Sequence, residues 1–517
     1  MEARDAFDYI IVGAGSAGVP LAARLSADPA RRVALIEAGP DYPTVAETPA
    51  DLLDGNEMSL IEHDWGFTAG LLPTRPTRYF QGKVTGGSSA VGNTIAIRGM
   101  PEDFEEWAAA GNPEWAWPKV LPHFLALEND LDFGGAFHGH DGPIPIRRWR
   151  PDELTPVQQS FLDGVLAAGY PYTDDHNHPA STGVGPAPST RRDSRVRVST
   201  AMGYLTPEVR ARDNLTIIAG AVVNRVLVDG AAARGVEVLT GSATQELRAR
   251  RVIVSAGAVN TPAILLRSGI GPEDELRRHG IDVRLDLPGV GAGLSEQART
   301  GVFMVPKPGA ENHGKSVGQI VMRTAGTGTA RANDMYYAMV NHFNLAVQFP
   351  HLRDAAQAER VTCLLAVARE PRSRGRVTLA STDPRVAPRV DLDFLSSEED
   401  HRLLADALRV VWELAQSPKI RDMADRIVLL TDSLMDSDEA VRDYVTASVD
   451  PAYNPTGTAR MGPAGDPGAV VDQRCAVHGI DGLFVADASV MPGQVRANIN
   501  MTVNMIGERV AELLGDD

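Results

Sequence analysis

The 517-residue sequence predicts two interleaved parts, a doubly wound α/β domain and a sheet-based α+β domain. Three observations favour this fold class. The chain begins with a strand, a glycine-rich turn and a helix, which is typical of the first unit of a doubly wound sheet. Residues 300–390 instead alternate as strands with few helices between them, which favours a separate sheet. The length also exceeds the size at which a single hydrophobic core stops growing.

The first unit carries the most specific motif. The apolar run Phe7–Val12 leads directly into Gly13-Ala14-Gly15-Ser16-Ala17-Gly18. Glycines at this spacing allow a tight turn, a close backbone approach to a pyrophosphate, and close packing of helix on strand. A second strand, 32–36, ends in Glu37, where a carboxylate binds the ribose of an adenine dinucleotide. The alternative is a glycine-rich turn that binds no ligand. It is disfavoured because the strand, the helix and the acidic residue all stand at the positions expected of a dinucleotide-binding motif.

Composition restricts the function further. The formal net charge of −17 argues against a nucleic-acid surface and against an anionic membrane patch. The two cysteines, Cys363 and Cys475, have no metal-ligand spacing, and we expect no metal. No stretch is apolar enough for a membrane span, and the first strand leaves no room for a signal peptide, so we expect a cytoplasmic protein.

Other segments follow in order. Residues 40–75 are rich in Pro, Asp and Glu and are expected to be irregular, and the Gly- and Ser-rich 82–93 is either a backbone lying on a flat or charged ligand or a plain loop. Hydrophobic spacing predicts helices at 118–129, 199–212, 261–267, 397–414 and 503–514. Strands are expected at 214–218, 222–228, 232–239, 247–254, 336–340, 360–368, 376–379 and 482–487.

A second strand–turn–helix passage and two histidine pairs are further candidate ligand-binding features. The turn 255–258, between a strand and a helix, again points backbone at a ligand, and includes Ala256 and Gly257. The pairs His138/His140 and His176/His178 are either fragments of a metal site or solvated loop residues, and the lack of a third ligand nearby favours solvated loops.

By its motifs the sequence resembles the glucose–methanol–choline (GMC) family of flavoproteins nearly from end to end. Residues 82–93 resemble the family's first signature and residues 257–271 its second. Arg374-Gly375-Arg376-Val377 and the tail from Gly457-Thr458-Ala459-Arg460-Met461-Gly462 to Asp487-Ala488-Ser489 follow the family too. The resemblance implies a Rossmann-like FAD-binding domain (1–155, 195–298 and 446–517) interleaved with a sheet-based substrate-binding domain (156–194 and 299–445).

The resemblance also implies a cofactor and its contacts. FAD is the expected dinucleotide, bound without a covalent link because Ala90 and its neighbours offer no histidine. The implied FAD-binding residues are Gly13, Gly15, Ser16, Ala17, Gly18, Glu37, Ala38, Trp65, Val84, Gly87, Ser88, Asn93, Ala96, Val223, Ala256, Gly257, Asp487, Ala488, Asn500, Met501 and Thr502.

In this family an alcohol loses a proton to a base, ordinarily a histidine, while its carbinol hydride goes to flavin N5. Here Asn454 stands at that position, and the second position, which hydrogen-bonds the hydroxyl, is assigned to Asn500. A neutral amide orients a hydroxyl but cannot take its proton at pH 7. The substrate is expected to be a small or medium alcohol, with O₂ or another electron acceptor. The negative net charge of the protein favours neutral or cationic alcohols as substrates.

The asparagine leaves four interpretations open. Another base or a water serves the alcohol; the candidate bases in the predicted substrate-binding domain are His313, His342 and His351, and Tyr336 and Tyr337 there are candidate hydrogen-bond donors. Alternatively, the substrate needs no base, or the flavin supports non-oxidative chemistry of the lyase or cyclase type. In the fourth, the protein is catalytically impaired, for example by an engineered His→Asn change. Two smaller departures from the family pattern are Gly92-Asn93 and Leu294-Ser295-Glu296-Gln297.

Overall fold

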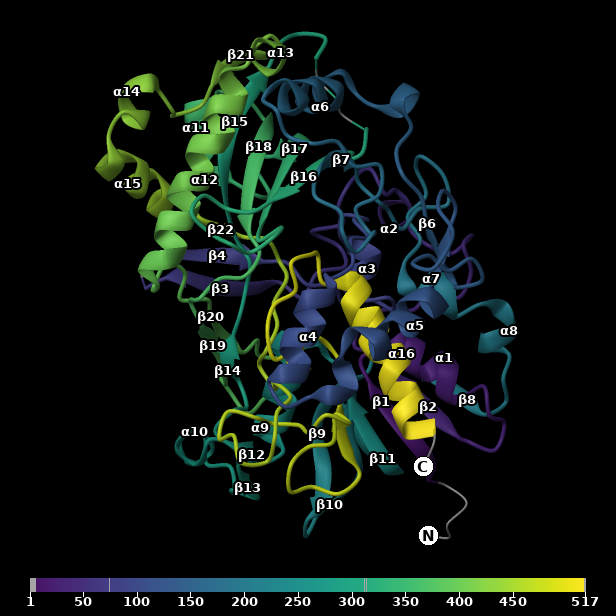
Figure 1. Ribbon diagram of the computed structural model, residues 1–517. Coiled ribbons are helices and arrows are strands. Elements are labelled where there is room, and N and C mark those ends of the chain that lie inside the picture. Colours follow the sequence, from purple (N-terminus) through teal and green to yellow (C-terminus); the bar gives the residue numbers. More distant parts are fainter. Residues whose placement is uncertain (1–5, 74, 311, 313, 516–517) are drawn as a thin grey trace.

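A computed structural model describes residues 6–73, 75–310, 312 and 314–515. The first large sheet has the order β8-β2-β1-β11-β10-β9, with β23 also paired to β11 (Figure 1). Its parallel part consists of β8 (Leu215–Ile218), β2 (Val33–Ile36), β1 (Phe7–Val12), β11 (Ala243–Val254) and β23 (Leu483–Val485). Because the last four residues of β1 and all of β2 are buried, these strands are continuous apolar runs, as parallel strands covered on both faces are.

The same sheet extends into an antiparallel meander. The long strand β11 pairs with β1 at its end and with β10 (Ala232–Thr240) at its beginning, and β10 pairs with β9 (Val222–Asp229). Gly230, at φ +57°, makes the turn between β9 and β10. The meander strands predicted from alternation are confirmed, and β11 begins four residues before its predicted start.

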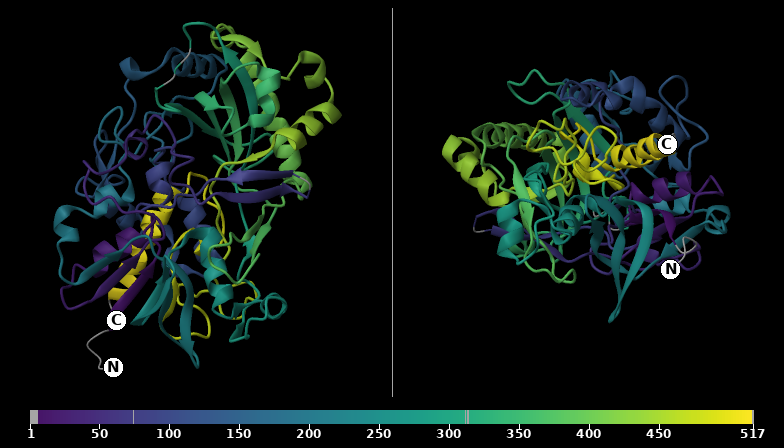
Figure 2. Two further views of the ribbon diagram at one scale, coloured as in Figure 1. Left: turned by 180° about the vertical axis from the view of Figure 1, so that it is seen from behind. Right: turned by 90° about the horizontal axis from the view of Figure 1, so that it is seen from below.

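Helices from both ends of the chain cover the first sheet. α1 (Gly18–Leu25) packs against the C-terminal α16 (Asn500–Gly515), which also contacts α5 (Trp117–Leu127). Both termini of the described chain therefore lie at the same end of the molecule (Figures 1 and 2). The remaining helices around this sheet are α4 (Pro101–Ala109), α7 (Thr200–Tyr204), α8 (Pro207–Arg210), α9 (Gly257–Arg267) and α10 (Glu273–Arg278).

The second large sheet is antiparallel and has the order β21-β15-β18-β17-β16-β7, with β22 paired to β15. Its strands are β7 (Gly183–Pro186), β15 (Ala298–Pro306), β16 (Ile320–Thr324), β17 (Met335–Asn344), β18 (Arg360–Ala368), β21 (Ala424–Ile427) and β22 (Asp450–Pro451). One face packs on α12 (Glu398–Gln416) and α6 (Pro156–Ala167). The fold therefore combines an α/β part with a sheet-based α+β part, as expected.

β17 is buried on both faces, and its alternate residues face different surroundings. Tyr337 and Met339 belong to the core shared with α12 and α6. Tyr336 and Ala338 point to the opposite side, where they line a cavity. This period of two is the geometry of a strand, but it is invisible in hydropathy because both faces are apolar.

A smaller sheet connects the two parts, in the order β14-β19-β20-β3-β4. It contains β14 (Ala292–Leu294), β19 (Gly375–Thr378), β20 (Arg389–Asp391), β3 (Phe67–Leu72) and β4 (Arg75–Tyr79). The prediction of irregular structure over 40–75 is therefore wrong for 67–72 and for 50–53, which form α2. Phe67, Ala69 and Leu71 point into the core while Thr68 is exposed, a short alternation that the flanking Pro- and Glu-rich segment obscured.

The helix predicted at 199–212 is two helices, α7 and α8, because Pro207 begins the second and Thr206 caps it. The other elements are short: α2 (Ala50–Leu53), α3 (Ser88–Val91), α11 (Arg353–Ala356), α13 (Pro418–Arg421), α14 (Asp432–Met435), α15 (Asp438–Ser448), β5 (Glu128–Asp130), β6 (Ile144–Ile146), β12 (Ile270–Gly271) and β13 (Leu285–Asp286).

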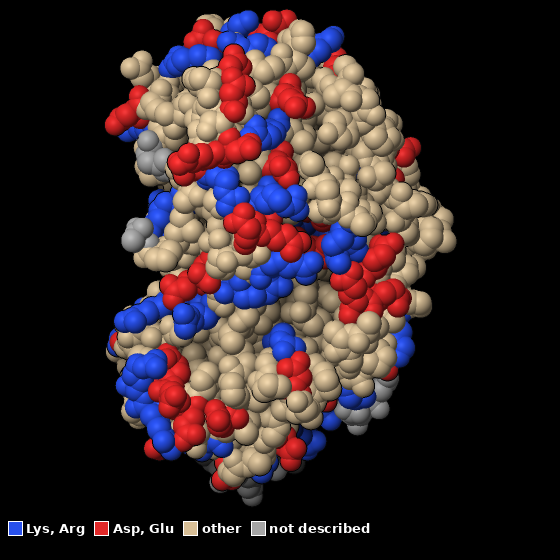
Figure 3. Space-filling view, turned by 60° about the vertical axis from the view of Figure 1, so that its left-hand side comes forward, with Lys and Arg blue, Asp and Glu red and all other residues tan. Residues whose placement is uncertain are grey.

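The charged surface is mixed. On the face shown in Figure 3, acidic and basic side chains are interspersed, and basic ones gather in a band across its middle. The net charge of −17 is therefore not concentrated on this face. Within the described ranges, no helix combines the length and the hydropathy that crossing a bilayer requires.

Candidate active site

A cavity of about 350 Å³ runs between the two large sheets. Its wall includes the turn after β1, the end of β2, the 87–95 loop, the start of α9, the segments 487–488 and 498–500, and strands β17 and β18. The predicted site residues that line it are Gly13, Gly15, Ser16, Ala17, Glu37, Ala38, Trp65, Gly87, Ser88, Asn93, Val223, Ala256, Gly257, Asn454, Asp487, Ala488 and Asn500. Gly18, Val84, Ala96, Met501 and Thr502 lie outside this lining.

The glycines of the first motif allow three backbones to meet. Gly13 has φ +100°, and a Cβ there would lie 2.4 Å from the carbonyl oxygen of Ser255. A Cβ on Gly87 would lie 2.8 Å from Cα of Gly15, so the 82–93 loop lies directly on the turn after β1. Gly18 allows α1 to pack closely on the turn, because a Cβ at this position would lie 1.9 Å from the Gly13 carbonyl oxygen. Any larger residue at Gly13, Gly18 or Gly87 would push these backbone segments apart.

Glu37 directly follows β2, lies in the cavity wall and is 6% exposed. Its carboxylate accepts hydrogen bonds from the backbone N–H of Ala14 (2.9 Å) and of Gly39 (2.8 Å). Burial raises the pKa of Glu37 to about 7, and these N–H donors act in the opposite direction. The acid is thereby held rigidly at the edge of the turn that the motif forms.

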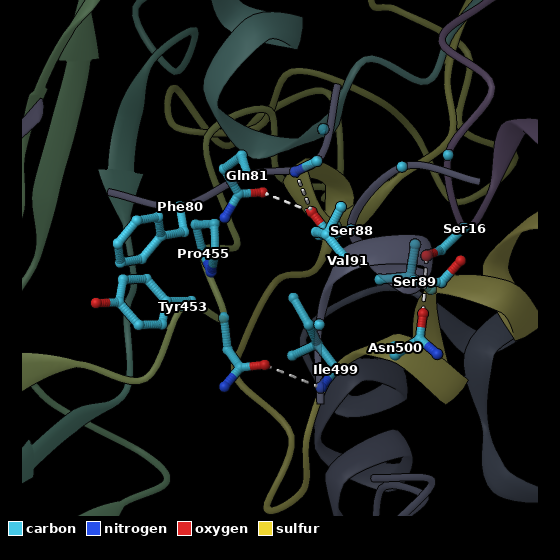
Figure 4. A pocket seen from close by; sticks show the side chains of 18 of the residues that line it. Ser16, Phe80, Gln81, Ser88, Ser89, Val91, Tyr453, Pro455, Ile499 and Asn500 are labelled. Atoms are coloured by element: carbon cyan, nitrogen blue, oxygen red, sulfur yellow. Dashed lines mark hydrogen bonds between the residues drawn. The ribbon is translucent and has the colours of Figure 1, made fainter. Parts of the chain in front are cut away.

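Asn500 lies on the nucleotide side of the cavity. Its Oδ1 accepts a hydrogen bond from the Ser16 hydroxyl (2.8 Å), and its backbone carbonyl accepts one from Asn504 (2.8 Å). Figure 4 shows the side chain of Asn500 directed at Ser16, away from Tyr453 and Pro455. Asn500 also begins α16, so the glycine turn faces the N-termini of two helices, where anions bind well.

Asp487 follows β23 and fastens the start of α9. Its carboxylate accepts from the backbone N–H of Gly257 (2.8 Å) and from the Thr261 hydroxyl (2.6 Å), and also from Ser489. Burial raises the pKa of Asp487, and these donors oppose that rise. The segment 487–488 is thus fixed against the second glycine turn, 255–258.

These features fit a bound adenine dinucleotide. The cavity offers backbone-only walls at Gly13, Gly15 and Gly87, a carboxylate at Glu37, and the hydroxyl of Ser255. That hydroxyl is buried and has no hydrogen-bond partner among the described residues. A buried polar atom without a partner is costly, and a polar ligand would satisfy it.

Four side chains, those of Gln297, Arg369, Asn454 and Asn498, form a hydrogen-bonded row at the other end of the cavity. Arg369 donates through Nη1 to Oε1 of Gln297, and Asn454 donates to the same oxygen through Nδ2 (3.1 Å). Arg369 also donates through Nη2 to Oδ1 of Asn498 (3.1 Å). Asn454 and Asn498 come from segments that meet here, because Oδ1 of Asn454 accepts from the N–H of Ile499 (3.4 Å; Figure 4).

This row determines the orientation of each amide. A guanidinium can only donate, so Gln297 and Asn498 must both present oxygen to Arg369. Gln297 therefore accepts from Asn454, whose second N–H donates to the carbonyl of Ala452 (3.1 Å). The cavity consequently meets Asn454 as an acceptor, through Oδ1, and Asn498 as a donor, through Nδ2.

Glu296 lies behind Asn454 and is buried. It accepts the backbone N–H of Asn454 (2.8 Å) and the hydroxyl of Tyr79. Burial raises the pKa of Glu296 to about 8, more than these donors lower it. At neutral pH this acid is therefore mostly uncharged.

The structure places one of the two candidate hydrogen-bond donors at the cavity and brings no described candidate base to it. Tyr336 lines the cavity, and burial raises its pKa to about 12. Tyr337 faces the core on the other side of β17. His342 does not line the cavity, and its Nε2 contacts the carbonyl of Lys315 (2.9 Å). His313 lies outside the described residues, as does the side chain of His351.

The expectation of solvated loops is wrong for His138, which is buried in an ion-paired cluster. Its two ring nitrogens lie 2.9 Å from carboxylate oxygens of Asp130 and Asp175. Glu128, Asp130 and His138 have the spacing of a metal site, but arginines already pair with both acids there. His176 is also buried, and the prediction fails because neither histidine belongs to an amphipathic pattern. His140 and His178 are exposed, as expected.

The His138 cluster predicts a pH dependence of stability. Burial alone would lower the pKa of His138, but the hydrogen bonds to Asp130 and Asp175 raise it from 6.5 to about 9. Its charge therefore stabilises the fold fully below pH 6.5, and this contribution is lost as pH rises to about 9. Denaturant unfolding between these pH values should show a loss of stability that is smaller in H138Q. Equal slopes would contradict the assignment.

The sequence analysis missed Asn498, Arg369 and the contact of Gln297 with Asn454. Asn498-Ile499-Asn500 offers two asparagines, and only the start of α16 at Asn500 separates their surroundings. Arg369 directly follows the apolar strand β18, and a charge at the end of a buried strand is the one signal that could have found it. Gln297 belongs to one of the two smaller departures from the family pattern.

The fold and this cavity define a dinucleotide-binding enzyme whose ligand lies between a nucleotide-binding sheet and a second, antiparallel sheet. Comparison with known proteins identifies the class: the chain belongs to the GMC oxidoreductase family. Two family models described as GMC oxidoreductase match residues 7–299 and 371–507. The family binds FAD and acts on alcohols, so this chain is a flavin-dependent oxidoreductase with a Rossmann-like domain and a substrate-binding domain.

Individual relatives cover nearly the whole chain. It is 34% identical to 5-(hydroxymethyl)furfural oxidase of Methylovorus sp., over 98% of each chain. It is 33% identical to oxygen-dependent choline dehydrogenase of Photobacterium profundum, over 98% of this chain and 93% of the relative. Among solved structures, pyridoxine 4-oxidase from Mesorbium loti matches with a TM-score of 0.90 and 30% identity, over 99% of both chains.

Proposed function

We propose that this protein oxidises the CH–OH group of a small or medium alcohol, with non-covalently bound FAD as the first electron acceptor. FAD supplies a hydride acceptor when bound. The Gly13–Gly18 turn, Glu37 and the N-termini of α1 and α16 would hold its nucleotide half, and 87–93 and 487–488 its other half. The observation that carries the proposal is the continuous cavity from Glu37 to Asn454. The domain boundaries and a cytoplasmic location stay predictions of the sequence.

The amide row gives the alcohol a defined orientation. Its hydroxyl would donate to Oδ1 of Asn454 and accept from Nδ2 of Asn498, the two atoms that the row leaves for the cavity. This proposal moves the hydroxyl contact from Asn500, as predicted from the sequence, to Asn498, because the carboxamide of Asn500 is bound to Ser16. Neither amide can take the proton, which leaves to water.

The rest of the substrate would meet apolar walls. The side chains there come from β17, β18 and the segments around Met58 and Phe80; they are Met58, Leu60, Phe80, Ala338, Val340, Phe343, Leu365 and Val367. An apolar body with one polar end fits such a pocket, since ligand sites combine mostly hydrophobic walls with a few polar groups.

Anaerobic mixing of the FAD-loaded protein with alcohols tests this function. We expect the flavin absorbance to bleach, slowly because neither amide acts as a base: general-base assistance is worth about 10²–10⁴-fold. Product formed without bleaching would instead support lyase- or cyclase-type chemistry. Neither bleaching nor product with any alcohol would identify a catalytically impaired protein. FAD released by denaturation with acid would confirm that the link is non-covalent.

A further inference from the structure

Arg369 stands out among the buried arginines of the described chain because it lines the cavity and has no carboxylate partner. Arg299, which also lines the cavity, is bound to Asp450. Arg191 and Arg197 have no carboxylate either, but each donates at least four hydrogen bonds to carbonyl and side-chain oxygens around it. Arg369 makes two side-chain hydrogen bonds, to Gln297 and Asn498.

Arg369 forms no ion pair with a carboxylate among the described residues. The side chain is 1% exposed, and its Nε has no hydrogen-bond partner within the described ranges. Its guanidinium lies 4.1 Å from the ring centroid of Tyr336. Glu296, the acid of the same network, attracts Arg369 electrostatically, but burial weakens this attraction by raising the pKa of Glu296 to about 8. Arg323 adds a second positive charge nearby. Burial lowers the pKa of Arg369 to about 10, so it remains a cation at pH 7.

A buried charge without a counter-ion is expensive, and a protein normally pairs it. Arg369 lines the cavity, and its Nε donates to no described residue. A carboxylate accepts guanidinium N–H groups in a bidentate manner. The missing counter-ion is therefore supplied best by a ligand. This local charge outweighs the preference for neutral or cationic alcohols that the net charge of −17 suggested.

We propose that the substrates of this enzyme are 2-hydroxy carboxylates with an apolar side chain, whose carboxylate binds Arg369. The inference rests on the proposed function and narrows it. Asn498 links the two groups, because its Oδ1 accepts from Arg369 and its Nδ2 would donate to the hydroxyl. The carboxylate and the carbinol would therefore be separated by the width of the Asn498 carboxamide, which suits groups on neighbouring carbon atoms. The apolar walls take the side chain.

The reaction balances as a two-electron oxidation. The C2–H bond breaks with its electron pair leaving as hydride to the flavin, and the hydroxyl loses its proton to water. A carbon–oxygen double bond forms at C2, so the product is a 2-oxo carboxylate. The electrons then pass to O₂ or another acceptor, as the proposed function requires.

Binding of unreactive ligands tests the charge without turnover. Phenylacetate and phenylacetamide share size and shape and differ in charge, and each is titrated into the FAD-loaded protein by calorimetry and by flavin difference spectra. We expect phenylacetate to bind on the order of 10- to 100-fold more tightly, the range for hydrogen bonds to charged groups. R369Q should reduce phenylacetate binding to that of the amide, and R369K should retain part of the preference. Equal affinities in the unaltered protein overturn the inference even if R369Q does not fold.

Turnover separates this inference from the function on which it rests. Flavin bleaching by mandelate should exceed that by mandelamide by a similar factor, and R369Q should remove the difference. Bleaching by neutral alcohols with no preference for mandelate overturns the inference and leaves the proposed function standing. No bleaching by any alcohol overturns the proposed function. Phenylacetate that binds R369Q as tightly as the unaltered protein overturns the role of Arg369.

Discussion

Replacing Asn454 with histidine is expected to accelerate flavin reduction by an alcohol by about 10²–10⁴-fold, the usual worth of a general base. The surroundings are suited to an imidazole. Oε1 of Gln297, held by Arg369, now accepts from Nδ2 of Asn454 and would accept a ring N–H equally well. That contact would fix the tautomer, leaving the second ring nitrogen unprotonated toward the cavity. Anaerobic stopped-flow measurement of bleaching at saturating alcohol checks the rate.

The control for this experiment is N454Q, which keeps a neutral amide and should show no gain. A second control is N454H combined with Q297L, which removes the acceptor that orients the ring and should lose most of the gain. If N454H binds FAD and alcohol yet reduces flavin no faster, the site does not perform base-limited alcohol oxidation. Non-oxidative chemistry would then be the better interpretation.

Replacing Gly18 with alanine is expected to abolish retention of FAD and to destabilise the fold by roughly 3 kcal/mol, the upper range for overpacking. The added Cβ would lie 1.9 Å from the carbonyl oxygen of Gly13, a backbone atom that cannot move without moving the phosphate turn. The ratio of flavin to protein absorbance after purification, together with the thermal midpoint, measures both effects.

G465A is the matched control, because Gly465 also has an ordinary φ and a Cβ there meets no atom within 4 Å. It should retain FAD and unfold like the unaltered protein. A G18A protein that purifies with a full complement of flavin would contradict the close packing of α1 on β1. It would also remove the main support for placing the pyrophosphate at this turn.

The nucleotide-binding half could be predicted because its signal is local. The glycines of 13–18, the strands around them and Glu37 lie within one short stretch, and each residue type has a steric or electrostatic reason to be there. The substrate half could not be predicted in the same way. Its polar row joins residues 297, 369, 454 and 498 from four separate segments, and no spacing in the sequence indicates that they meet.

Asn498 and Asn500 illustrate the limit of motif reading. The two residues are identical in type and two positions apart, yet one contacts Arg369 and the other Ser16. Which of them faces the cavity depends on where α16 begins, and helix boundaries are the least reliable part of a sequence-based prediction. Tyr336 and Tyr337 show a related limit. Because both faces of β17 are buried, hydropathy does not indicate which of the two tyrosines lines the cavity.

The alternation along β17 has a consequence for how this enzyme can change. Positions 336, 338 and 340 border the cavity, whereas 335, 337 and 339 belong to the core shared with α12 and α6. Substrate contacts and the packing against α12 and α6 therefore depend on alternate residues of one strand. Directed evolution at 336, 338 and 340 would change the cavity wall while leaving the residues that pack against α12 and α6 unaltered.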